Sequence, residues 1–125
     1  MKTSELTGAA LNWAVAGCEG RTILQFIGGG ILVNGRTEIG DELPQEQGFN
    51  YMWHPSTNWA QGGPIIEREC IELTKSYKGN WVGYKFIPSV KSPTQIGDAP
   101  LIAAMRCYVA SKLGDEVEIP KELQN

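Results

Sequence analysis

The sequence predicts an α+β fold in which an antiparallel β-sheet carries two helices packed on one face. Two observations lead to this fold class. An apolar pattern with helical spacing lies near each end of the chain, and short segments with alternating apolar residues lie between them. The chain has 125 residues, which suits one hydrophobic core, so we expect a single domain over residues 1–125.

The first expected helix starts at a cap provided by Thr3 or Ser4 and runs to about Gly17. Its apolar residues fall on two faces instead of one. The first face holds Leu6, Ala9, Ala10, Trp13, Ala16 and Gly17, and the second holds Leu11, Val15 and Cys18. Because such a helix needs a cover on both sides, and the sheet supplies only one, we expect a homo-oligomer.

Residues 23–27 and 31–33 are expected to form strands on either side of Gly28-Gly29-Gly30. Neither Gly-Lys-Ser/Thr nor a helix follows these glycines, as a phosphate-binding loop requires. We therefore interpret them as a hairpin turn or strand bulge. Residues 36–50 are polar and rich in turn residues, and they predict a long loop.

A β-hairpin is predicted for residues 65–77 and 80–87, followed by a linker over 88–97. Residues 98–113 predict the second helix, with Pro100 in its first turn and Gly114 just past its end. The remaining tail is acidic and is expected to cross the surface.

The segment 53–64 concentrates unusual residues: two Trp, the only His, two Pro and a Gly pair. Pro55 and Pro64 lack an amide proton and suit neither a helix interior nor a central strand. The sequence therefore predicts a loop, which is either a structured binding loop or a compact plug over the core. We expect Trp59 to pin this loop and to lie deeper than Trp53 at its entrance.

The same segment supplies most of the candidate ligand-binding residues, because it offers aromatic faces and uncharged hydrogen-bonding groups. In a ligand site, the indoles would stack on a planar group, the polar side chains would bond to its edge, and the glycine amides would hold an anionic part. The candidates are Trp53, Ser56, Thr57, Asn58, Trp59, Gln61, Gly62 and Gly63.

Arg106 is a further candidate, at the margin of the apolar stripe of the second helix. A charge in that position needs a partner. The structural alternatives are an internal carboxylate, such as that of Glu67, or a loop carbonyl. The functional alternative is a ligand phosphate, which suits the guanidinium fork.

Catalytic and metal sites are poorly supported by the residues present. His54 is the only imidazole, and the chain has no Gly-x-Ser-x-Gly motif to go with it, so we expect His54 to pack or to form hydrogen bonds. Glu67 and Glu69 would share one face of the predicted strand, which we interpret as a solvated face. The three cysteines are widely spaced and form no zinc motif. We expect free thiols, no metal and no cofactor.

The net charge of −3 and the pI near 5.1 disfavour a nucleic-acid-binding protein. No apolar run approaches the roughly 20 residues that cross a bilayer, so we expect no contact with a membrane. The N-terminus leads directly into a polar helix start, and we expect no signal peptide. Together with three free cysteines, this predicts a location in a reducing cytoplasm.

Three blocks of sequence resemble the phage NinX-like family, small proteins of temperate phages. They are Pro-Ser-Thr-Asn-Trp-Ala-Gln-Gly-Gly-Pro-Ile-Ile-Glu-Arg-Glu at 55–69, residues 2–16 and residues 100–117. The resemblance spans nearly the whole chain and implies a phage protein in the host cytoplasm. Members often carry Tyr-Ser where Trp53 and His54 stand here, so the resemblance implies no shared role for His54.

These observations predict a non-enzymatic phage accessory protein that binds a small ligand, of the nucleotide type, and so sequesters a host immune signal. The last step is an analogy with other phage proteins of similar size. An alternative is an interaction factor of phage replication or recombination, and a further alternative is a small hydrolase.

Overall fold

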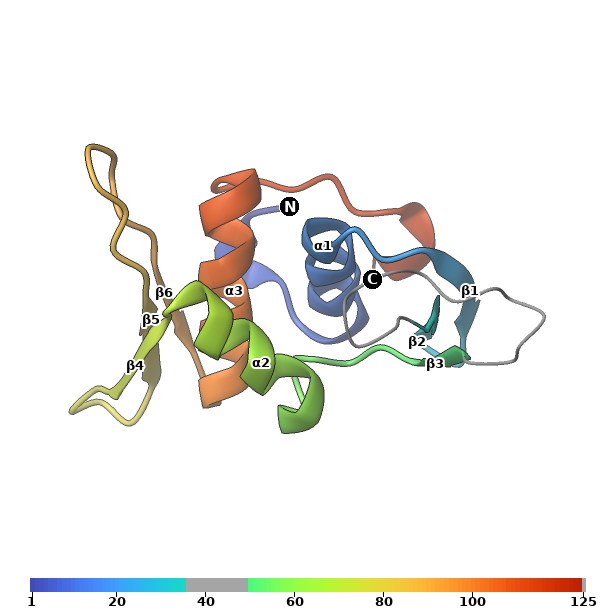
Figure 1. The fold of residues 1–125 in the computed structure, drawn as a ribbon, viewed down its shortest axis with the longest axis horizontal. Helices are drawn as coiled ribbons and strands as arrows, with labels where there is room; N and C mark the ends of the chain where they lie inside the picture. The colour runs from blue at the N-terminus through green and yellow to red at the C-terminus, as the bar shows by residue number, and fades with distance from the viewer. Residues whose placement is uncertain (36–49, 125) are drawn as a thin grey trace.

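A computed structural model describes residues 1–35 and 50–124 and arranges them in layers, with a sheet at each end of the molecule and the helices between them (Figure 1). The helices are α1 (Gly8–Glu19), α2 (Trp59–Glu69) and α3 (Pro100–Leu113), with short 3-10 helices at Thr3–Glu5 and Lys121–Leu123. One sheet contains β1 (Ile23–Ile27), β2 (Gly30–Asn34) and β3 (Asn50–Met52), and the other contains β4 (Glu72–Lys75), β5 (Trp81–Tyr84) and β6 (Thr94–Gly97).

Both sheets are antiparallel, so the predicted α+β class is confirmed. The prediction of a single sheet with two helices on one face is wrong, because the strands form two separate sheets. The strands predicted around Gly28-Gly29-Gly30 do form a hairpin, in which Ile27 pairs with Gly30. The loop predicted over 36–50 lies outside the described residues except for Asn50, which starts β3.

Helix α1 begins later than predicted and is covered within the chain. Thr3 precedes it in a 3-10 helix, where its Oγ1 donates a hydrogen bond to Gly114 O at 2.7 Å. The helix then lies between α3 and β2, and both Leu11 and Val15 are fully buried (Figure 1). The two apolar faces therefore need no partner subunit, and the homo-oligomer stays a prediction that α1 no longer supports.

Helix α2 occupies residues that were predicted to be loop and strand. The helix starts because the Asn58 side chain accepts a hydrogen bond from Ala60 N at 2.8 Å and so caps it. Pro64 lies inside the helix and removes one amide donor. Packing outweighs this loss: Ile65 is buried in the core, and a Cβ at Gly62 would lie only 2.5 Å from Pro55 O. Tertiary contacts therefore decide the conformation of α2, and these contacts cannot be read from the local sequence pattern.

After α2 the predicted hairpin is present in shortened form, because its first arm is strand only from Glu72 onward. The linker predicted over 88–97 contains an additional strand, β6, which pairs with β5. The second predicted helix is confirmed as α3, with Pro100 in its first turn and Gly114 just after its end. Across the described residues, every helix is too short or too polar to cross a lipid bilayer.

The β4–β6 sheet lies very close to α3, and two glycines permit this approach. A Cβ at Gly83 would lie 2.6 Å from Ala103 O, and one at Gly97 would lie 2.6 Å from Ala103 N. Both distances are shorter than any van der Waals contact, and the opposing atoms belong to the backbone of α3. Side chains larger than glycine would therefore push the sheet away from the helix.

We expect Gly97→Ala to lower the free energy of unfolding by roughly 1–3 kcal/mol, because the new methyl group has no room. Gly63→Ala is the matched control: it lies in α2, where the nearest atom to an added Cβ is Trp59 Cε3 at 4.0 Å. The control should be neutral or gain up to about 1 kcal/mol of helix propensity. Thermal denaturation measures both changes, and similar melting temperatures for the two variants would contradict the close packing described here.

Candidate functional site

The two tryptophans of the segment 53–64 lie at depths opposite to those predicted. Trp53 is only 3% exposed, and its Nε1 donates a hydrogen bond to Asn12 O on α1 at 3.1 Å. The guanidinium of Arg21 lies over its ring at 4.6 Å. Trp59 is 54% exposed at the start of α2. Trp53 is therefore the structural anchor, and Trp59 leaves an aromatic surface in solvent.

The polar groups predicted to contact a ligand are largely used within the chain. Gln61 bridges two loop positions, since its Oε1 accepts from His54 N at 2.7 Å and its Nε2 donates to Met52 O at 2.8 Å. Ser56 N donates to Asn12 Oδ1 at 3.1 Å, and Thr57 Oγ1 donates to His54 O at 3.3 Å. These bonds, with the Asn58 cap, make the segment a tightly bonded turn that leads into α2.

The glycine pair of this segment splits into one packing position and one open position. Gly62 is buried against Pro55 and Leu101 of α3, whereas Gly63 has open space around its Cα. The structure therefore places the predicted site residues in one continuous stretch, a turn and the start of α2, in which several of their polar groups bond to other described residues of the chain. The Ser56 hydroxyl is buried and has no hydrogen-bond partner among the described residues.

Among the described residues, His54 contacts a hydroxyl group and forms no ion pair. Its Nδ1 lies 3.2 Å from Thr57 Oγ1, and the carboxylates of the described residues form no ion pair with it. A triad needs an acid that orients the imidazole and a nucleophile beside it. In residues 1–35 and 50–124, the His, Cys, Asp and Glu side chains also form no group of three that would hold a metal ion.

Arg106 binds two backbone carbonyls and so joins distant parts of the chain. Its Nε donates to Leu6 O at 2.8 Å, and its Nη1 donates to Ile96 O on β6 at 2.7 Å. Burial lowers the pKa of Arg106, while the nearby Asp98 carboxylate acts in the opposite direction. Both partners are carbonyls, but they belong to Leu6 and Ile96 and not to the 53–64 loop that was considered. Glu67, the carboxylate considered as its partner, lies on α2.

An ion cluster between α1, α2, α3 and the residue that follows β5 was not predicted. The residues of this ion cluster are Glu19, Arg68, Glu69, Lys85, Tyr108 and Lys112. Arg68 forms a fork with Glu19, at 3.1 Å from Nη1 and 2.5 Å from Nη2, and also donates to Glu69 at 2.9 Å. Lys85 Nζ donates to Glu69 at 2.6 Å, and the Tyr108 hydroxyl donates to Glu19 at 2.5 Å.

The ion cluster shifts the pKa values of its members in the directions that ion pairing and burial require. Burial would raise the pKa of Glu69, but the hydrogen bonds from Lys85 and Arg68 outweigh it and lower this pKa to about 2. Burial and the Glu19 carboxylate raise the pKa of Tyr108. Burial likewise raises the pKa of the adjacent Cys18 thiol to about 11, so this thiol is a weak nucleophile.

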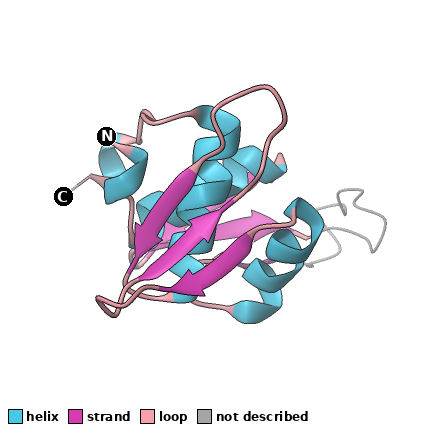
Figure 2. Cartoon of the chain, turned by 90° about the vertical axis from the view of Figure 1, so that its left-hand side faces the viewer, coloured by secondary structure: helices cyan, strands magenta, loops and turns pink. Residues whose placement is uncertain are grey.

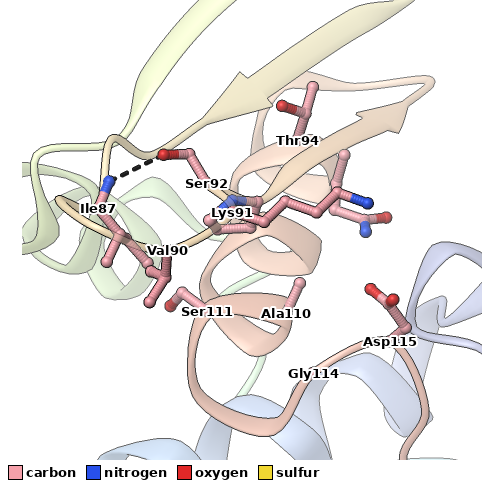
Figure 3. A pocket seen from close by; sticks show the side chains of 11 residues that line it. Ile87, Val90, Lys91, Ser92, Thr94, Ala110, Ser111, Gly114 and Asp115 are labelled. Carbon is pink, nitrogen blue, oxygen red and sulfur yellow. Dashed lines mark hydrogen bonds between the residues drawn. The ribbon is translucent and has the colours of Figure 1, made fainter.

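A groove opens between the end of α3 and the loop that joins β5 to β6 (Figure 3). We call it the α3 groove. Its volume is about 500 Å³, and polar side chains line most of it together with Ile87, Val90 and Ala110. The polar lining consists of Lys91, Ser92, Thr94, Gln95, Ser111 and Asp115. None of these residues was a sequence candidate, because the residues that line the groove come from separate parts of the chain.

The β4–β6 sheet has one face on α3, and no helix of the described residues covers the other face, as Figure 2 shows from that side. Strand alternation places Val82, Tyr84 and Ile96 on the free face, with Phe86 continuing the pattern beyond β5. Ile96 is 54% exposed and Phe86 is 66% exposed, whereas Val82 and Tyr84 are half-buried. We call this surface the outer face.

Burial predicts that Trp53→Ala lowers the free energy of unfolding by roughly 3–5 kcal/mol, as for other buried tryptophans. Replacing the exposed Trp59 by alanine should lower the free energy of unfolding by about 1 kcal/mol or less. Urea unfolding of the two variants measures the difference. A Trp59→Ala protein that is less stable than Trp53→Ala would contradict the positions described here.

The lowered pKa of Glu69 predicts that its ionised carboxylate stabilises the fold at neutral pH and loses this effect in acid. Because its pKa is about 2 in the folded protein, below that of an unfolded carboxylate, its stabilisation is complete at neutral pH and is lost as the pH falls toward 2. We expect Glu69→Gln to cost at most about 3 kcal/mol at pH 7 and clearly less at pH 3. Urea unfolding at both pH values tests this, and an equal loss at pH 7 and pH 3 would refute it.

Comparison with known proteins places the chain in a family. A family model described as Bacteriophage P22, NinX matches residues 2–112, which includes α1, α2, both sheets and all of α3 except its last residue. No curated protein matches the chain. A match over this much of the sequence establishes membership, and the chain therefore belongs to the phage NinX family.

Proposed function

We propose that this phage protein is a non-enzymatic accessory factor that acts by binding a partner protein on its β4–β6 side. The observation that carries the proposal is the uncovered outer face. Sheets in soluble proteins commonly cover an apolar face, and an exposed apolar surface rimmed by polar residues is typical of an interaction site. Here Ile96 and Phe86 lie on such a face, with polar Thr74 and Thr94 beside them.

The distribution of polar groups also supports binding over catalysis. The strongest charged constellation, the ion cluster, has its carboxylates paired with three cations and lies between helices. His54 has a hydroxyl neighbour but no ionic partner among the described residues. A factor of phage replication or recombination that contacts another protein fits this arrangement, and so does an inhibitor of a host protein.

The α3 groove favours a second candidate, a small anionic ligand of the nucleotide class. Its volume lies within the range of small-molecule sites. Lys91 supplies a cation there, and Ser92, Thr94 and Ser111 supply hydroxyls that suit a phosphate or a ribose. Binding of this kind would let the protein sequester a host immune signal. Against it, Asp115 stands on the same lining, and its charge repels an anion.

Affinity purification from infected host cells tests the proposal. We expect one polypeptide to co-purify with the wild-type chain and to be lost with the double variant Phe86→Ser, Ile96→Thr, which removes the two exposed apolar side chains of the outer face. Tyr77→Ser is the control, because Tyr77 is 94% exposed at the β4–β5 turn and lies outside the outer face. This variant should retain the polypeptide.

The same preparation separates the two candidates. Mass spectrometry of the small molecules released by heat would reveal a bound nucleotide. If a nucleotide is released by the wild-type protein but not by Lys91→Ala, and no polypeptide depends on the outer face, the second candidate replaces the first.

A further inference from the structure

We propose that the free edge of β6 binds an extended peptide segment of the partner, which adds a strand to the β4–β6 sheet. This inference rests on the proposed function and specifies which part of the partner is recognised. Strand addition supplies main-chain hydrogen bonds and needs only one exposed edge with unused donors and acceptors.

The register of the sheet determines which backbone groups of β6 face this edge. Lys85 N donates to Pro93 O at 3.2 Å, so the odd-numbered residues of this segment bond to β5. The even-numbered residues, Thr94 and Ile96, direct their N–H and C=O groups to the opposite side. The hydrogen bond from Arg106 Nη1 to Ile96 O agrees, because it reaches that carbonyl from outside the sheet.

Three main-chain groups on this edge are available to a docking strand. They are the N–H and C=O of Thr94 and the N–H of Ile96, none of which bonds to another described residue. An antiparallel strand would exchange two hydrogen bonds with Thr94 and accept a third from Ile96. The Arg106 guanidinium already occupies the fourth group and marks where the pairing ends.

The space beside the edge has the length of a short strand. The α3 groove runs along one end of β6, and a second hollow of about 340 Å³ runs along the other, lined by Ser4, Asp98 and Arg106. Both hollows include Thr94 and Gln95 in their linings, so they adjoin along β6. The four residues of β6 span about 13 Å, which accommodates a segment of roughly four extended residues.

The charges along this space favour a peptide with little net charge. Lys91 and Asp115 line one end, and Arg106 and Asp98 line the other, so each end carries one cation and one anion. A residue of the peptide that points outward would lie beside the exposed side chain of Ile96. We therefore expect an uncharged segment with alternating apolar residues.

A peptide at the edge of β6 is a better candidate than a second copy of the chain that docks face to face on the outer face. Three strands of four residues present about 200 Å² in projection, whereas stable interfaces bury about 800 Å² per partner. The outer face alone is too small for a face-to-face dimer. Main-chain hydrogen bonds at the edge supply the affinity that the area does not.

A displayed library of random heptapeptides, selected on the full chain, provides the probe. We expect the selected peptides to show apolar residues at every second position. Their affinity, measured by fluorescence anisotropy, should fall at least tenfold with Thr94→Pro, which removes an edge donor and leaves the bonds to β5 intact. Lys75→Pro is the matched control: because Ser76 N bonds to Asn80 O, Lys75 N–H faces the free edge of β4. This control should bind as the wild type does.

Hydrogen exchange on the wild-type protein gives a reading that does not depend on the folding of any variant. A bound peptide should slow the exchange of the Thr94 and Ile96 amides and leave the edge amides of β4 unchanged. The inference is overturned if no peptide is selected, if protection appears elsewhere, or if Thr94→Pro binds normally. It is also overturned if the wild-type chain dimerises through β6, since the occupant is then a second copy.

The two proposals fail in different ways. If a polypeptide depends on Phe86 and Ile96 but binds Thr94→Pro as tightly as the wild type, the proposed function stands and strand addition does not. If library peptides bind the edge while no polypeptide of infected cells does, the edge is competent but the proposed function is wrong.

Discussion

The close contact between α3 and the β4–β6 sheet is the constraint on which the rest of the structure depends. Helix α3 is buried on several sides, with Leu101, Met105 and Tyr108 in the core. A helix of this kind needs covers on more than one face. The sheet supplies one cover because Gly83 and Gly97 let its backbone approach that of α3. Helix α1 supplies another, and behind it lies the β1–β3 sheet.

This arrangement explains why charged residues that could be taken for functional groups form hydrogen bonds that stabilise the fold. At the end of α2, Arg68 bonds to Glu19 on α1, and Glu69 bonds to Lys85 just after β5, so α2 is joined to both a helix and the sheet. Arg106 ties β6 to the segment before α1. Many donors and acceptors of the described residues are used inside the fold. The sites that we propose for a partner therefore lie on surfaces that this packing leaves exposed: the outer face, the α3 groove and the edge of β6.

Sequence reasoning recovered the elements whose signals are local. The early proline and terminal glycine of α3, the hairpin at Gly28-Gly29-Gly30 and part of the β4–β5 hairpin follow from neighbouring residues. It missed α2, because Pro64 argues against a helix that core contacts nevertheless stabilise. It also reversed the depths of Trp53 and Trp59. The ion cluster and the α3 groove could not be predicted from the sequence, because each of them brings together residues from distant parts of the chain.

Native-state hydrogen exchange across α3 and β5 tests the central claim most directly. If close packing joins the sheet to the helix, the slowest amides of both elements should exchange only through global unfolding. Their opening free energies should then be equal and should fall with denaturant at the same slope. Slow amides in β5 that exchange at a clearly lower free energy than those of α3 would show that the sheet opens alone, which contradicts the account.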